Sequence, residues 1–599
     1  MWFRWRFAPA LLILPAAVAQ HVGTPTDDLD KLSVDELFNV QVTSVGRKAQ
    51  ELSKAPAAVF VLTSEDIRRS GATCIPEALE WVPGLTVLRL DGRSWVVSAR
   101  GGARLYADKM LVMVDGASLY TPTFSGVIWD AIDIPMEEIE RIEVVRGPGA
   151  VMWGPNAVNG VINIITRSAG STARGRVSQT SGNETRDSTE ASWSAPANAR
   201  LSYKVWGTFS FLKPGYGSAG YSQLNDDVPY AQAGVRNMDE GAGSMGFRLE
   251  GAAGPKDQWM VQGSISKTDR QDPAVYPILL PYGVDSVQGH TDYLGEFLQV
   301  RWTRTNSPGD ESTLQFSLIS NSIDFPYIRS PLNTFTLDYQ KRLQTGERNE
   351  IYWGAGFQQY WDSTSSSGFF ASFSPAASTY RSGDVVVRDE YQLVPDRLAG
   401  SVGIRLDYNS FSHFEYQPSV RLLYTPNQTQ SAWIAASRAV RVPSRINRDI
   451  VFNGGAMLAD GMPVSLLSYG SPSMRAEVER SLEAGYRVQS GQRWSVDASV
   501  FWSYYDRLAG MSGPPQPVVT FNGLTPVLVY PLTYGNMGRG RSYGAEIWAA
   551  WQVRQGWRLL PTYSYLSEDR WLPANGAETY EWDTPLATGT ASVSVALAA

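Results

Sequence analysis

The residues best suited to hold a ligand are arginines and aromatic residues between positions 93 and 129. They are Arg93, Trp95, Arg104, Tyr106, Tyr120 and Trp129. Guanidinium groups and aromatic rings bind chelated, planar or anionic ligands through charge, stacking and cation–π contacts. The same side chains also pack well against a protein wall, so the sequence leaves both roles open for each of them.

Catalytic chemistry has little support in this sequence. The histidines, His21, His290 and His413, are widely spaced, and Cys74 is the only cysteine. These residues do not suit a histidine-based metal site or an internal disulfide, and no G-x-S-x-G elbow or assembled nucleophile–base signature stands out. The formal net charge of −7 argues against nucleic acid as a partner. We expect no enzyme activity, no metal site and no cofactor.

Turns and strands alternate closely in residues 139–167. Residues 140–145 alternate polar and β-branched side chains, as a half-buried strand does. Gly147-Pro148-Gly149 and Gly154-Pro155-Asn156 are turn signals, and residues 161–166 predict a buried strand. Similar strand, turn and helix signals continue through residues 51–170 and predict a compact α+β domain there.

Helix signals in this domain are local and specific. A strand at residues 57–62 precedes a helix capped by Thr63 and ended by Gly71, and Pro76 lies in the first turn of a second helix. Further strands are expected at residues 85–89, 96–100 and 110–115.

The chain begins with a predicted secretory signal. Arg4 and Arg6 precede an apolar run at residues 7–18, and small residues end at Ala19 before Gln20. The run is shorter than the ~20 residues of a membrane-spanning helix. Residues 20–50 show no core of their own, with a short helix expected at residues 33–38 and an unpaired strand at residues 39–45.

Amphipathic strands fill the chain from residue 171 onward. In residues 398–408 one parity is mostly apolar and the other is small or charged, and residues 351–358 repeat the pattern. A soluble β-sandwich would alternate in the same way. The predicted signal peptide, the 20 Trp, 28 Tyr and 21 Phe, and the polar residues on the enclosed face favour a transmembrane β-barrel instead.

Turn signals allow a strand count. Longer excursions at residues 213–243 and 442–472 lie between short turns, and residues 591–597 would form a last strand. The count is about 18 antiparallel strands, because each short turn joins two of them. The short turns are expected near Pro196, Pro255, Pro308, Gly346, Pro395, Pro426, Gly491 and Gly556.

Several segments resemble TonB-dependent outer-membrane receptors. In residues 51–170 these are SGATCIPEALEWVPGLTV, the Arg100-Gly101 pair, LVMVDGASLYTP and IERIEVVRGPGAVMWGPNAVNGVINIITR. In the later part they are SRAVRVPSRINRD from Ser437, SLEAGYR from Ser481 and SYGAEIWAAW from Ser542. The resemblance implies an α+β plug domain, residues 51–170, inside a β-barrel, residues 171–599. The family barrel has about 22 strands, so a count of about 18 reads as a C-terminal truncation.

The resemblance also implies how such a protein is energised. A periplasmic segment, here residues 20–50, carries a TonB box that adds as a strand to TonB, which works with the ExbB/ExbD energisation complex. The box is placed at Asn39, Val40, Gln41, Val42, Thr43, Ser44 and Val45. A disordered linker and a first plug strand are the alternatives for this segment.

In the family, plug arginines at strand ends meet glutamates of the barrel. Arg100 and Arg146 are the plug candidates, and strand parity places Glu483 and Glu546 on the lumen face. Buried pairs of this kind would act as a latch, because removing one partner costs several kcal/mol. Ordinary solvated lumen charges are the alternative for each pair.

These features predict an importer in the outer membrane of a Gram-negative bacterium, surrounded by lipid and acting as a monomer. The resemblance implies a ferric siderophore or another metal chelate as the small-molecule ligand, with cobalamin, haem or a glycan as alternatives. A passive porin would lack a folded plug. A transducing receptor would need another domain before the box, and residues 20–39 are too few for one.

Overall fold

The computed structural model describes most of the chain after residue 39. The described ranges are 40–89, 94–103, 109–170, 175–183, 185–198, 200–213, 240–271, 274–278, 283–287, 290–325, 328–366, 371–459, 462–491, 493–514, 517–522, 525–554, 557–571, 576–577 and 587–595. The predicted leader, the helix expected at residues 33–38 and Asn39 lie outside these ranges, as do Arg93, Arg104 and Tyr106.

The plug is built around a five-stranded sheet in the order β3-β8-β9-β6-β7. Strands β6 and β9 run parallel, and the other neighbours are antiparallel. A separate hairpin joins β4 to β5. The strands are β3 (Ala58–Thr63), β4 (Leu85–Arg89), β5 (Trp95–Ala99), β6 (Met110–Val114), β7 (Ala117–Ser118), β8 (Ile139–Arg146) and β9 (Gly160–Thr166).

Short helices connect these strands as the sequence predicts. Helix α2 (Ser64–Ser70) has a capping box between Thr63 and Asp66 and ends at Gly71, whose φ of 72° is left-handed. Helix α3 (Ile75–Leu79) carries its proline in the first turn. The remaining short helices are η2 (Leu52–Lys54), η3 (Trp129–Ala131), η4 (Met136–Glu138) and α4 (Ala150–Trp153).

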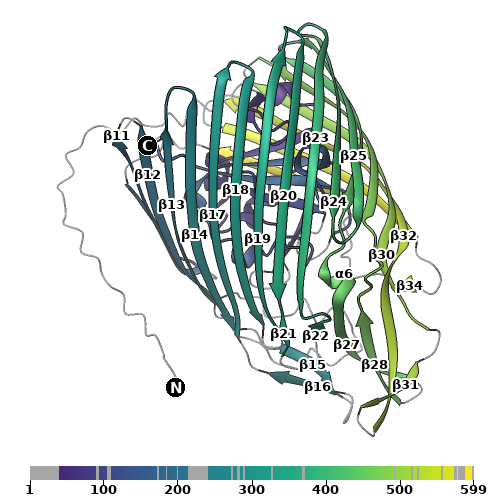
Figure 1. Ribbon diagram of the computed structural model, residues 1–599. Coiled ribbons are helices and arrows are strands. Elements are labelled where there is room, and N and C mark those ends of the chain that lie inside the picture. Colours follow the sequence, from purple (N-terminus) through teal and green to yellow (C-terminus); the bar gives the residue numbers. More distant parts are fainter. Residues whose placement is uncertain are drawn as a thin grey trace, which may run out of the picture.

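Most of the rest of the described chain forms a 24-stranded sheet that wraps around the plug (Figure 1). Neighbouring long strands are antiparallel and follow the order of the sequence. Six members are extra strands in the loops, and the other eighteen build the wall. The wall strands are β10 (Gly175–Thr180), β11 (Thr185–Asn198), β12 (Leu201–Leu212), β13 (Glu240–Ala252), β14 (Asp257–Gln271), β17 (His290–Ser307), β18 (Asp310–Phe325), β19 (Ile328–Thr345), β20 (Asn349–Ser363), β23 (Ala377–Val394), β24 (Leu398–Asn409), β25 (His413–Asn427), β26 (Gln430–Arg441), β29 (Glu477–Ser490), β30 (Trp494–Ser512), β32 (Thr525–Arg554), β33 (Trp557–Trp571) and β35 (Ala587–Val595).

The two ends of the wall differ in their connections. The predicted short turns fall between consecutive wall strands at one end, which we call the turn rim. The turn near Gly556 itself lies outside the described residues, between the ends of β32 and β33. The other end, the loop rim, carries the longer connections and lies at the bottom of Figure 1. Its elements are β15 (Ala274–Ile278), β16 (Gly283–Val287), β21 (Ser365–Ser366), β22 (Ala371–Phe373), α6 (Arg445–Asp449), β27 (Ile450–Ala459), β28 (Met462–Tyr469), β31 (Val518–Asn522) and β34 (Gly576–Ala577).

Side chains alternate between the two faces of the wall as predicted. Trp353 and Phe357 of β20 are exposed on the outer face, whereas Tyr352 is buried toward the plug. In β24, Arg405 and Asp407 are buried while Ile404 and Leu406 are exposed outward. The lumen face is therefore polar, and the outer face carries aliphatic and aromatic side chains, as in membrane barrels.

The described residues contain no helix long and apolar enough to cross a membrane.

Candidate functional site

Four charged residues join the plug to the wall in one buried cluster. Arg100 follows β5 and contacts Glu483 of β29 at 2.5 Å and Glu546 of β32 at 3.3 Å. Arg146, the last residue of β8, contacts the other carboxylate oxygen of Glu546 at 3.0 Å. All four side chains are at most 6% exposed. The structure thus brings together the four residues expected to form the latch, and we call them the plug–wall ion cluster.

Further hydrogen bonds connect this cluster to its surroundings. Glu483 accepts bonds from the backbone N–H of Ala58 at 3.2 Å and from the indole of Trp433 at 3.0 Å. Arg146 donates to the carbonyl of Pro83 at 2.8 Å. Burial opposes the charge of Arg100, but the nearby carboxylates outweigh it and raise the pKa of Arg100 above its usual value.

Glycines make room for the buried charges. Gly147 has a φ of 93°, and a Cβ there would lie 2.4 Å from the Arg100 guanidinium and 2.7 Å from Glu483. Gly84 has a φ of 75°, and its Cβ would lie 2.7 Å from Glu546. The Gly-Pro turn after β8 and the Pro-Gly turn before β4 are therefore required for the wall glutamates to reach the plug.

Sequence reasoning missed two further wall arginines at this interface. Arg487 of β29 donates to the carbonyls of Leu52 at 2.8 Å, of Ala55 at 2.5 Å and of Ala57. Arg421 of β25 donates to the carbonyls of Pro56 and Pro148. The alternation of side chains along each strand predicts that both arginines face the lumen. Their partners in the plug, however, are backbone carbonyls, which have no sequence signature.

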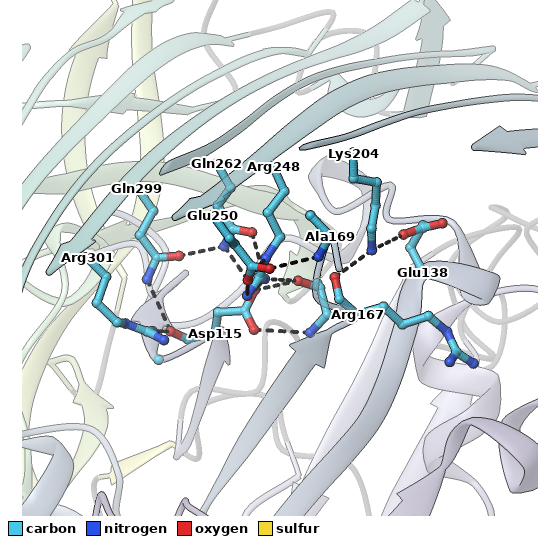
Figure 2. A network of polar contacts seen from close by, with 12 residues as sticks. Asp115, Glu138, Arg167, Ala169, Lys204, Arg248, Glu250, Gln262, Gln299 and Arg301 are labelled. Carbon is cyan, nitrogen blue, oxygen red and sulfur yellow. Dashed lines mark hydrogen bonds and ion pairs between the residues drawn. The ribbon is translucent and has the colours of Figure 1, made fainter. Parts of the chain in front are cut away.

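A second polar contact centres on Asp115, the residue after β6 (Figure 2). Its carboxylate accepts from Thr166 of β9 and, across the interface, from Arg248 of β13 at 3.2 Å and Gln262 of β14 at 2.9 Å. Its carbonyl accepts from Gln299 and Arg301 of β17. One plug turn is therefore held by three successive wall strands, and we call this set the Asp115 network.

Adjacent contacts extend the Asp115 network along the same part of the wall (Figure 2). Lys204 of β12 pairs with Glu138 at 2.7 Å and donates to the carbonyl of Arg167 at 2.5 Å. Glu250 of β13 accepts from the backbone N–H of Ala169 at 2.8 Å. The sequence predicted the strand before Asp115 but gave no sign that its turn binds the wall.

The segment expected to be the TonB box is docked on the plug. Strand β1 (Gln41–Val42) pairs with β2 (Gln50–Glu51), and Val42 is fully buried in the plug core. The expectation of an unpaired strand is thus wrong for these two residues, because they pair with β2. Val42 also joins an apolar cluster that includes Val59 and Val145.

A single buried carboxylate holds the next two residues of this segment. Glu143 of β8 is fully buried and accepts from the backbone N–H groups of Thr43 at 2.9 Å and Ser44 at 2.8 Å. The Ser44 hydroxyl donates to the same oxygen at 2.6 Å. Trp153 adds a bond from its indole to the Ser44 carbonyl at 2.6 Å.

Three of the predicted ligand contacts are packed inside the protein. Trp95 and Trp129 lie in the main plug core, and Tyr120 lies in the cluster that holds Val42. Each is at most 8% exposed. Of the two roles that the sequence left open, the structure shows packing for these residues, because their large rings fill the space between the strands and loops of the plug. Arg93, Arg104 and Tyr106 lie outside the described residues.

The interior of the part of the chain that the structure describes contains a small cavity but no cluster of metal-binding side chains. No group of three or more His, Cys, Asp or Glu residues there could hold a metal ion. A cavity of about 80 Å³ lies between the plug and the wall near Lys204 and Trp206. A cavity of this size holds only a few water molecules.

Comparisons with known proteins agree with this architecture. Residues 51–161 match the TonB-dependent Receptor Plug Domain, and residues 153–594 match the TonB dependent receptor-like β-barrel. The iron-regulated outer membrane virulence protein of Vibrio cholerae is 24% identical over 585 residues, covering 94% of this chain and 83% of that protein. The vitamin B12 transporter BtuB of Vibrio vulnificus is 31% identical over 236 residues, which cover 38% of this chain and 37% of BtuB.

A solved structure shows the same fold at low identity. The siderophore receptor PirA from Acinetobacter baumannii superposes with a TM-score of 0.69 and 16% identity, covering 90% of this chain and 84% of PirA. Together with the plug that fills the barrel and the buried ion pairs that hold it there, these matches establish that the chain belongs to the family of TonB-dependent receptors.

Proposed function

We propose that this protein imports a ferric siderophore or another metal chelate across the outer membrane of a Gram-negative bacterium. The observation that carries the proposal is the folded plug inside the barrel, held to the wall by buried ion pairs. A plug bound in this way must shift before a ligand can cross the barrel, and breaking buried ion pairs requires work. This favours an energised importer over a passive porin.

The orientation follows from the two rims. We place the loop rim outside the cell and the turn rim at the periplasm, because outer-membrane barrels have short periplasmic turns and longer external loops. The exposed outer-face residues, such as Trp353 and Phe357, then contact lipid.

We propose that TonB, energised by ExbB/ExbD, pulls on residues 39–45. Binding to TonB by strand addition uses backbone N–H and C=O groups of an extended peptide. The N–H groups of Thr43 and Ser44 are bound to Glu143 in the docked segment, so this carboxylate must release them before TonB can pair with those residues. The docked segment therefore represents a resting state.

An iron chelate is the favoured ligand because of the names of the relatives over most of the chain. The Vibrio cholerae relative that covers 94% of this chain is iron-regulated, and PirA is a siderophore receptor. The 31% identity to a BtuB over 236 residues favours cobalamin as the second candidate. Within the plug, we assign ligand contact to Arg93, Arg104 and Tyr106, since the other three predicted contacts are buried.

Accumulation assays separate the two ligand classes. The ferric enterobactin receptor of Pseudomonas aeruginosa, 28% identical to this chain over 218 residues, suggests ferric enterobactin as the first probe. We expect cells that lack their own receptors and express this protein to take up ⁵⁵Fe-enterobactin but not ⁵⁷Co-cobalamin. Uptake of cobalamin alone would replace the proposed ligand with the second candidate. Equal uptake in cells with and without TonB would contradict an energised importer.

A further inference from the structure

A short plug loop, residues 121–126, reaches a part of the wall that neither the plug–wall ion cluster nor the Asp115 network touches. The loop closes on itself through a bridge between Thr121 and Gly126. Its neighbours are α6 and β20, and its Phe124 packs with a cluster of wall aromatics that includes Tyr360 and Phe411.

The first turn of α6 binds the carbonyls of this plug loop. The N–H of Arg445 donates to the Pro122 carbonyl at 2.9 Å, and the N–H of Ile446 donates to the Thr123 carbonyl at 3.2 Å. These N–H groups have no partner inside the helix, since the first four donors of any helix lack one. The plug loop therefore completes the hydrogen bonding of a wall helix.

Buried side chains reinforce the contact. The Thr123 hydroxyl donates to Asp362 at 2.8 Å, and Asp362 pairs with Arg445 at 2.5 Å. Both Asp362 and Arg445 are fully buried. A parallel bridge runs from Ser125 to Arg441 at 2.8 Å, and Arg441 pairs with Glu477.

Arg445 also binds the loop rim. Its guanidinium donates to the Pro375 carbonyl just after β22 and pairs with Asp449 at 2.8 Å. Strand β27 begins at Ile450, immediately after α6, and pairs with β22. Its hairpin partner β28 pairs with β32, and β15 contacts β27 (Figure 1). We call β22, β27 and β28 the rim sheet.

We propose that Arg445 is a positioning residue that couples the rim sheet to the plug. Through its backbone N–H and Asp362 it holds the plug loop 121–126, and through Pro375 and Asp449 it holds the rim sheet. A plug that leaves its resting position thus removes partners from α6 and loosens the rim sheet. By linkage, a ligand that holds the rim sheet in place favours the docked plug loop. This coupling goes beyond import itself and does not depend on the identity of the ligand.

Hydrogen–deuterium exchange of the full-length protein in detergent tests the coupling without any ligand. Thr123→Val keeps the side-chain shape but removes the hydroxyl, and with it the bond to Asp362 and the contact with the Tyr360 hydroxyl. We expect exchange at residues 450–452 and 464–469 to rise about tenfold, because a hydrogen bond to a charged group is lost. Thr123→Ser should restore the wild-type rate.

A control variant separates directed coupling from general loosening. Thr121→Val removes a hydroxyl that binds only within the loop, to the Gly126 carbonyl at 3.1 Å, and should leave exchange in the rim sheet near the wild-type rate. If Thr123→Val fails to fold, Ser125→Ala removes the bond that Arg441 donates to the same loop and should also raise exchange in the rim sheet. Unchanged exchange in the rim sheet for the variant that folds, or an equal rise for Thr121→Val, would overturn the proposal.

Discussion

Replacing Glu546 by glutamine tests the contribution of the plug–wall ion cluster. Glu546 bridges the two plug arginines, at 3.3 Å from Arg100 and 3.0 Å from Arg146. Glutamine keeps the shape and one oxygen acceptor but removes the charge. The cluster would change from two positive and two negative charges to two positive and one negative, at a place where each side chain is at most 6% exposed.

The magnitude follows from burial and distance. Two unit charges 3.0 Å apart attract by roughly 5 kcal/mol at an effective dielectric constant of about 20. The relief of the carboxylate desolvation cost offsets part of this loss, and removing one partner of a buried pair typically costs about 3–5 kcal/mol. At 1.4 kcal/mol per factor of ten, plug opening should become roughly 100- to several-thousand-fold more frequent.

Hydrogen–deuterium exchange at the amides of β8 measures this opening in the full-length protein. We expect faster exchange for Glu546→Gln and a partial return when Arg146→Met is added, because the second change restores charge balance. Glu415→Gln is the matched control, since Glu415 is a buried lumen carboxylate that pairs with Arg438 of the wall. A rise below threefold for Glu546→Gln, or a double variant that exchanges faster than the single one, would refute the reasoning.

Three other changes have defined outcomes. Glu143→Gln should weaken the docking of residues 43 and 44 on the plug. In the absence of ligand, the affinity for the TonB C-terminal domain should then rise about tenfold, as measured by calorimetry. Glu140→Gln on the same strand should leave this affinity unchanged. Asp115→Asn should lower the free energy of unfolding of the plug by about 1.5–3 kcal/mol, measured by urea unfolding with tryptophan fluorescence. An unchanged urea midpoint would show that the Asp115 network does not stabilise the plug. Gly147→Ala should lower the free energy of unfolding by at least about 2 kcal/mol in the same assay, because alanine is strained in the left-handed conformation and its Cβ would displace Arg100. Wild-type stability would mean that Arg100 can move aside without loss.

Local structure could be predicted from the sequence at positions where the residue type has a single well-known structural role. The capping box at Thr63 and Asp66 and the turn at Gly71 depend only on neighbours a few residues away. The eight short turns and the inward parity of Glu546 follow from the two-residue repeat of strands. These features define the architecture because a barrel wall repeats one simple pattern.

Contacts between distant segments were predictable only through the family resemblance. Arg100 meets Glu483 across 383 positions of sequence, and no local pattern selects that glutamate over its buried neighbour Glu479. Asp115 and Glu143 gave no signal, because an acidic residue in or after a plug strand has many possible partners. Trp95 and Trp129 were ambiguous because large rings suit both cores and ligand sites.

Energised import is tested most directly by removing the segment on which TonB is proposed to pull. The probe is the radiolabelled compound that the wild-type protein accumulates, which we propose is ⁵⁵Fe-enterobactin. Its surface binding and its uptake are compared between cells that express the full chain and cells that express a variant without residues 39–45. We predict that the variant binds the probe at the cell surface as the wild type does but accumulates none. Uptake by the variant at the wild-type rate would contradict the account.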